Sequence, residues 1–81
     1  MTPREDIVNE LRILAEAVLS SGGTLHPGDR LAGRGLDSVA MVGLLSSVEE
    51  RFGVSIPPEE ITPENFSTVT ALATLVSRLQ E

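Results

Sequence analysis

The sequence predicts an all-α fold: a small bundle of three main helices, one short helix and a long first loop. Apolar residues recur three times at the three- and four-residue steps of an amphipathic helix, and residues that cap or break helices bound each stretch. Leu, Ile, Val and Phe supply 25 of the 81 residues, which is enough to build a core despite a net charge of −6. We therefore expect residues 1–81 to form a single domain.

The first helix is expected to begin near Pro3 and to end before the Ser-Ser-Gly-Gly run at 20–23. Proline suits a first helical turn, and Glu5 and Asp6 place negative charge where the helix dipole favours it. The predicted inward face consists of Ile7, Leu11, Leu14 and Val18. A long loop rich in Gly, Pro and Asp follows. A loop of this length in so small a domain indicates a functional role and anchoring by buried side chains, here Leu25, Leu31 and Leu36.

The second helix is expected to begin at Asp37 or Ser38, since both residue types cap helices well, and to end at Gly53. Its predicted buried stripe consists of Val42, Leu45, Val48 and Phe52, with Leu44 beside it. Val39 and Met41 fall outside that stripe, so we expect them on the surface.

Two further elements complete the predicted bundle. Thr62 and Pro63 are typical of the start of a short helix over residues 62–66. The last helix is expected to start at Ser67 or Thr68. Its predicted inward residues are Val69, Leu72, Val76 and Leu79.

Composition excludes several classes of function. Lysine is absent and the six arginines are scattered, which argues against nucleic-acid binding. Without cysteine the chain has no thiolate, and its one histidine, His26, is expected on the surface without a chemical role. Neither a metal-ligand pattern, a signal peptide nor a membrane-spanning apolar run is present in the sequence. We expect a cytoplasmic monomer with no membrane partner.

The negative charge is unevenly distributed along the chain. Residues 1–36 carry five acids and four arginines, residues 37–64 carry six acids and one arginine, and residues 65–81 carry one of each. Nearly all of the net charge therefore lies in the segment from the second predicted helix to the short one.

Three segments together resemble the acyl carrier protein family: Asp29-Arg30-Leu31, Gly35-Leu36-Asp37-Ser38 and the run from Glu49 to Pro57. The specific part is Gly-Leu-Asp-Ser placed fourteen residues before Phe-Gly-Val, with Ile-Pro close behind. The resemblance implies a freestanding carrier with an acyl-carrier-like four-helix bundle. It also implies that Ser38 receives 4′-phosphopantetheine from coenzyme A through a phosphopantetheinyl transferase, and that Asp37 helps to present the serine. From position alone, a helix cap is the better interpretation of Ser38, and the family resemblance reverses this preference.

The resemblance implies that partner enzymes catalyse the reactions, while this chain carries the cargo as a thioester. The chain itself is not expected to be an enzyme, because no nucleophile and base are paired in it. Val39 and Met41 are predicted to contact partners near the arm. The acidic residues predicted to meet basic patches on loading and modifying enzymes are Glu49, Glu50, Glu59 and Glu60, together with Glu64.

Several positions depart from the pattern of fatty-acid carriers. Ala40 and Gly43 replace acids that many of those carriers have early in this helix, and Arg34 replaces the usual leucine. Arg34 is expected either to point to water, which we favour, or to pair with the phosphodiester on Ser38. Because of the Asp-Ser pair we favour acyl cargo in fatty acid, polyketide or specialised biosynthesis. An aminoacyl or peptidyl carrier of a nonribosomal pathway and an unmodified helical interaction module stay as alternatives.

Overall fold

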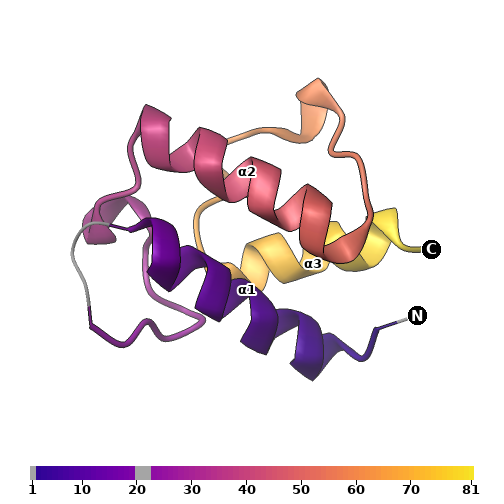
Figure 1. Cartoon of the computed structure of the whole chain (residues 1–81), viewed down its shortest axis with the longest axis horizontal. Coiled ribbons are helices and arrows are strands. Elements are labelled where there is room, and N and C mark those ends of the chain that lie inside the picture. The colour runs from indigo at the N-terminus through magenta and orange to yellow at the C-terminus, as the bar shows by residue number, and fades with distance from the viewer. Residues whose placement is uncertain (1, 20–22) are drawn as a thin grey trace.

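Three α-helices carry the fold of the part of the chain that the structure describes (Figure 1). The computed structural model describes residues 2–19 and 23–81. The helices are α1 (Arg4–Val18), α2 (Ser38–Phe52) and α3 (Val69–Leu79), and two short 3-10 turns, η1 (Ala32–Arg34) and η2 (Pro58–Glu60), lie between them. The all-α prediction is confirmed.

The short element predicted over residues 62–66 is present as a single hydrogen-bonded turn and does not extend into a helix. Phe66 donates its backbone N–H to the carbonyl of Thr62 at 3.2 Å, and the Thr62 hydroxyl accepts from the N–H of Asn65 at 3.1 Å. The Ser67 hydroxyl then donates to the carbonyl of Glu64 at 2.8 Å, and α3 starts two residues later, so a second turn has no room to form.

The boundaries of α2 and α3 follow from their caps. The carboxylate of Asp37 accepts from the N–H of Ala40 at 2.8 Å, and the hydroxyl of Thr68 accepts from the N–H of Ala71 at 3.0 Å. Gly53 ends α2 with a φ of +65°, a conformation that other residues adopt only with strain. Each of these boundaries lies where the capping residues predict it.

The core is built mainly on α3, which packs against α1, while α1 also packs against α2. Figure 1 shows α3 behind the other two helices, with the start of α1 and the end of α3 at the same side of the molecule. Burying this apolar surface is the main stabilising contribution to a small bundle. The buried residues are Ile7, Leu11, Ala15, Leu19, Leu25, Leu31, Leu44, Val48, Ile56, Phe66, Val69, Leu72, Ala73, Leu75 and Val76.

The buried face of α2 differs from the prediction. Leu44 and Val48 are fully buried, with Leu45 and Phe52 partly buried beside them, whereas Val42 is 66% exposed. Met41 was expected on the surface but packs against the core. Apolar residues crowd this helix, so the sequence allows two helical phases, and packing against α1 and the common core selects the one led by Leu44.

The long first loop is anchored at several points. Leu25 and Leu31 are buried and Leu36 is partly buried, which confirms the predicted anchors. The Leu31 N–H donates to the carbonyl of Ser67 at 2.9 Å, and the Leu25 N–H donates to the carboxylate of Glu16 at 2.7 Å. The loop is therefore tied to α1 on one side and to the start of α3 on the other.

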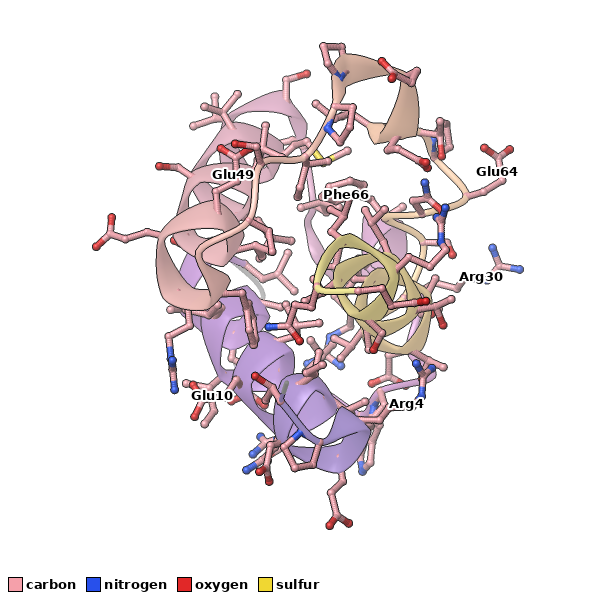
Figure 2. All side chains as sticks on the ribbon, turned by 90° about the vertical axis from the view of Figure 1, so that its right-hand side faces the viewer. Arg4, Glu10, Arg30, Glu49, Glu64 and Phe66 are labelled. Carbon is pink, nitrogen blue, oxygen red and sulfur yellow. The ribbon has the colours of Figure 1, made fainter. Side chains whose placement is uncertain are left out.

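The chain leaving α2 is held in a similar way. The Glu49 carboxylate accepts from the backbone N–H of Ile56 at 2.7 Å, seven residues along, and Ile56 enters the core. Figure 2 shows Glu49 beside this segment. A carboxylate that satisfies a partly buried N–H stabilises the fold by more than an ordinary exposed charge does.

We expect Glu49→Ala to lower the free energy of unfolding by about 1 kcal/mol, because the Ile56 N–H loses its acceptor. Urea denaturation followed by circular dichroism measures this change. Glu50→Ala is the matched control, since Glu50 is the exposed neighbour on the same helix. Equal stability of the two variants would contradict a structural role for Glu49.

Candidate functional site

Ser38 is the first residue of α2, and its side chain is exposed. Asp37, one residue earlier, is the cap: its side chain binds the N–H of Ala40, and its carbonyl accepts from the N–H of Met41 at 2.8 Å. The Ser38 hydroxyl is therefore not needed as a cap, and it has no hydrogen-bond partner among the described residues. This geometry leaves an uncommitted hydroxyl at a helix N-terminus.

The path of the loop before Ser38 sets where this hydroxyl lies. The N–H of Leu36 returns to the carbonyl of Leu31 at 3.1 Å, which closes the chain around η1. Gly35 makes this return possible with a φ of +98°, a region in which a side chain is strained. Because Leu31 is buried, the loop delivers Ser38 to a defined place on the surface.

Arg34 does not point freely to water, which was the favoured expectation. Its guanidinium donates to the Asp29 carboxylate at 2.9 Å and to the Thr24 carbonyl at 3.2 Å, so it binds the loop before Ser38. The alternative, an ion pair with a phosphodiester on Ser38, stays a prediction. The backbone N–H of His26, donated to Asp29 at 3.0 Å, lowers the pKa of that carboxyl, and Arg34 lowers it further. The His26 side chain lies on the loop surface, as expected, at 3.6 Å from Asp29.

An apolar surface adjoins Ser38 on α2. Val39 is 82% exposed and Val42 is 66% exposed, which makes them large apolar side chains that contribute little to the core. Val39 occupies the surface position predicted for it. Val42, which was assigned to the core, joins it on this surface.

Two hollows, each of about 370 Å³, lie on either side of the first turns of α2. The first is lined by Val18, Gly35, Asp37, Val39, Ala40 and Gly43. A Cβ on Gly43 would lie 3.7 Å from the Val18 side chain, which is an ordinary contact, so packing within the chain does not require glycine there. The second hollow is lined by Arg30, Ala32, Leu36, Met41, Ile61, Thr62, Pro63, Phe66 and Ser67.

The predicted acidic surface divides into two groups. Glu49 is bound to Ile56, and Glu60 is bound to Arg78 at 3.2 Å and to the Asn65 side chain at 3.0 Å. The Arg78 and Asn65 hydrogen bonds lower the pKa of the Glu60 carboxyl. Glu50, Glu59 and Glu64 are exposed, and Figure 2 shows Glu64 extending away from the bundle. Only this second group is fully available to a partner.

Ser38 meets the physical requirements for a covalently attached phosphate ester. The N–H groups in the first turn of a helix lack intrahelical partners, and the helix dipole favours negative charge at this end. The hydroxyl is exposed, and the surface beside it is open. The described residues hold no group of three or more potential metal ligands and no helix long and apolar enough to cross a bilayer.

Comparison with known families identifies the kind of site. Residues 9–76, which include Ser38, match the family described as phosphopantetheine attachment site. The chain belongs to this family of phosphopantetheine-binding carrier proteins. It is a carrier and not an enzyme, as the resemblance implied.

Two relatives of the carrier come from Bradyrhizobium diazoefficiens. The carrier is 44% identical over 52 residues to aminoacyl carrier protein 2, a match that covers 64% of this chain and 58% of that relative. It is 36% identical over 74 residues to aminoacyl carrier protein 1, which covers 88% of this chain and 82% of that relative. The carrier thus spans little more than half of the first relative and most of the second.

Two solved structures share the fold of the carrier. One is Bradyrhizobium japonicum glycine:[carrier protein] ligase complexed with glycylated carrier protein, with a TM-score of 0.80 and 30% identity over 86% of this chain and 97% of the matched chain. The other is that ligase with its cognate carrier protein and an analogue of glycyl adenylate, with a TM-score of 0.74 and 35% identity over 93% and 96%. Since nearly all of each matched chain is covered by this small one, the matched chains are the carrier proteins.

The sequence patterns did not predict the roles of some groups that are important to the site. The N–H of Leu25 lowers the pKa of the Glu16 carboxyl, with help from Arg12, and this contact anchors the loop that leads to Ser38. Glu49 and Glu60 were predicted to be docking residues, and their bonds within the chain were not foreseen. No local pattern reports such contacts, because their partners lie several to many residues away.

We expect the carrier to lose stability in acid. The folded-state pKa values of Glu16, Asp29 and Glu60 are all lowered, so their contribution is present above the ordinary carboxyl range and is lost as the pH falls through it. Urea unfolding between about pH 6 and pH 3 measures the slope. Glu16→Gln should flatten this slope, because an amide oxygen still accepts from Leu25 but does not titrate. Glu5→Gln, exposed on the same helix, is the control, and an equal flattening in both variants would contradict the assignment to Glu16.

Proposed function

We propose that the chain is an aminoacyl carrier protein in which Ser38 bears 4′-phosphopantetheine. The observation that carries the proposal is the exposed Ser38 hydroxyl, which is free of capping because Asp37 caps α2. When bound, the prosthetic group supplies a terminal thiol that holds the amino acid as a thioester. The partners are a phosphopantetheinyl transferase and an amino-acid-loading ligase, and the site of action is the cytoplasm.

We propose aminoacyl cargo in place of the acyl cargo that the sequence alone favoured. Both curated relatives are aminoacyl carrier proteins, and the structural relatives are partners of a glycine:[carrier protein] ligase. The Asp-Ser pair, which favoured an acyl carrier, has a local explanation. Asp37 serves as the helix cap, so the residue type before Ser38 reflects the start of α2 and does not identify the cargo.

The residues around Ser38 have separable roles in this proposal. Asp37 fixes the first turn of α2 and so orients the serine toward the transferase. The unpaired N–H groups of that turn favour the phosphodiester. Val39 and Val42 offer the apolar contact nearest the attachment point, and Glu50, Glu59 and Glu64 offer exposed negative charge farther along. A partner with an apolar patch bordered by basic residues fits this surface.

We expect incubation with coenzyme A and a broad-specificity phosphopantetheinyl transferase to add the mass of one phosphopantetheine to the intact protein. Ser38→Ala should abolish the addition, since no hydroxyl is left at the start of α2. Ser46→Ala, an exposed serine later in the same helix, is the matched control and should be modified like the wild type. The intact mass of the protein from its native host, with the arm ejected, then identifies the load. A wild-type chain left unmodified by several transferases, or a native load that is a fatty acyl group, would overturn the proposal.

We expect Glu50→Arg to slow loading by the ligase about threefold to tenfold at low ionic strength, because long-range attraction to a basic partner is weakened. The difference should shrink as salt is added, since screening shortens the reach of exposed charges. Glu81→Arg makes the same change in net charge at the other end of the chain and should have a smaller effect. Initial rates at several salt concentrations measure this. Equal slowing by both variants would show an effect of net charge alone.

A further inference from the structure

Arg30 differs from the other arginines in having no partner among the described residues. Its side chain makes no hydrogen bond or ion pair there, and the residue is exposed. Figure 2 shows it extending into solvent on the same side of the molecule as Glu64. The five others each bind a carboxylate, a hydroxyl or a carbonyl of the chain: Arg4, Arg12, Arg34, Arg51 and Arg78.

Arg30 is one of the residues that line the second hollow beside α2. Four of the other lining side chains are large and apolar: Leu36, Met41, Ile61 and Phe66. Its volume of about 370 Å³ accommodates a large apolar side chain. An open apolar hollow with an uncommitted guanidinium in its lining is complementary to an apolar group that has an anionic neighbour.

We propose that this hollow is a docking site for the amino-acid-loading enzyme, which inserts an apolar side chain over Met41 and Ile61 and places a carboxylate against Arg30. The inference rests on the proposed function, because it assumes such an enzyme. It gives the enzyme a negatively charged group that faces Arg30, in addition to the basic residues expected to face Glu50 and Glu64. One cation within a mainly acidic surface fixes the orientation of docking, since a rotated partner would bring like charges together.

The direction in which Arg30→Glu changes the loading rate distinguishes a contact between Arg30 and a carboxylate from general electrostatic attraction. Arg30→Glu makes an acidic protein more negative by two charges, so attraction to a basic partner alone would speed loading. A carboxylate opposite Arg30 predicts the reverse, because the variant places two negative charges together. A slower variant is therefore diagnostic.

The test measures kcat/KM for glycine loading of the phosphopantetheinylated protein by Bradyrhizobium japonicum glycine:[carrier protein] ligase at low ionic strength. Arg30→Glu should lower kcat/KM about tenfold, and Arg30→Lys should keep it within about twofold of the wild type. Arg4→Glu is the matched control: it changes the net charge equally, in the first turn of α1, where an acid is tolerated. Circular dichroism confirms that the variants are folded.

If the ligase loads the Arg30→Glu variant as fast as the wild type, or faster, the inference is overturned. The proposed function is then left intact. A phosphopantetheinylated wild-type chain that the ligase does not load would overturn the inference, whereas the proposed function is overturned by a native load that is a fatty acyl group.

A second measurement identifies the occupant of the hollow. Methyl NMR signals of Met41 and Ile61 should shift when the ligase is added, with or without the prosthetic group on Ser38. The alternative result is that these signals shift when the prosthetic group is attached to Ser38 and do not shift further when the ligase is added. In that case the prosthetic group itself fills the hollow, and the docking assignment is wrong.

Discussion

Anchoring of the long first loop is the constraint on which the site depends. Leu31 is buried, and its N–H bonds to the carbonyl of Ser67 at the approach to α3. This contact holds the loop against the bundle just before the chain turns through Gly35 into α2. Ser38 would otherwise follow a flexible segment, and its position relative to α2 and to any partner surface would vary. In the proposed function, this anchoring gives the prosthetic group on Ser38 a fixed attachment point.

Negative charge in this protein serves two purposes that a count of acids does not separate. Glu16, Glu49 and Glu60 bind backbone or side-chain donors from other segments and hold the loops in place. Glu50 and Glu64 extend into solvent, where their charge acts over a distance on other molecules. The excess of acids in residues 37–64 is thus partly structural and partly available for docking.

The helix boundaries were predictable because caps and breakers act locally. Asp37, Gly53 and Thr68 mark the ends of α2 and α3 where the sequence places them. The buried face of α2 was not predictable, because Met41 and Val42 are both apolar and adjacent. Choosing between them requires knowing which side of the helix meets α1 and the core. The same limit applies to Arg34, whose partner Asp29 lies in the same loop but is reached only when that loop folds back.

The sequence by itself determined the all-α class, the serine at the start of the second helix and the carrier family, since these depend on residue type and short spacing. The tertiary structure decided which side chains around that serine are available. It buried part of Met41, exposed Val42, engaged Arg34 with Asp29 and left Arg30 without a partner in the described chain. The physical reason is that availability depends on how the loop folds back on itself and on contacts between segments distant in sequence, and packing of the whole bundle sets both.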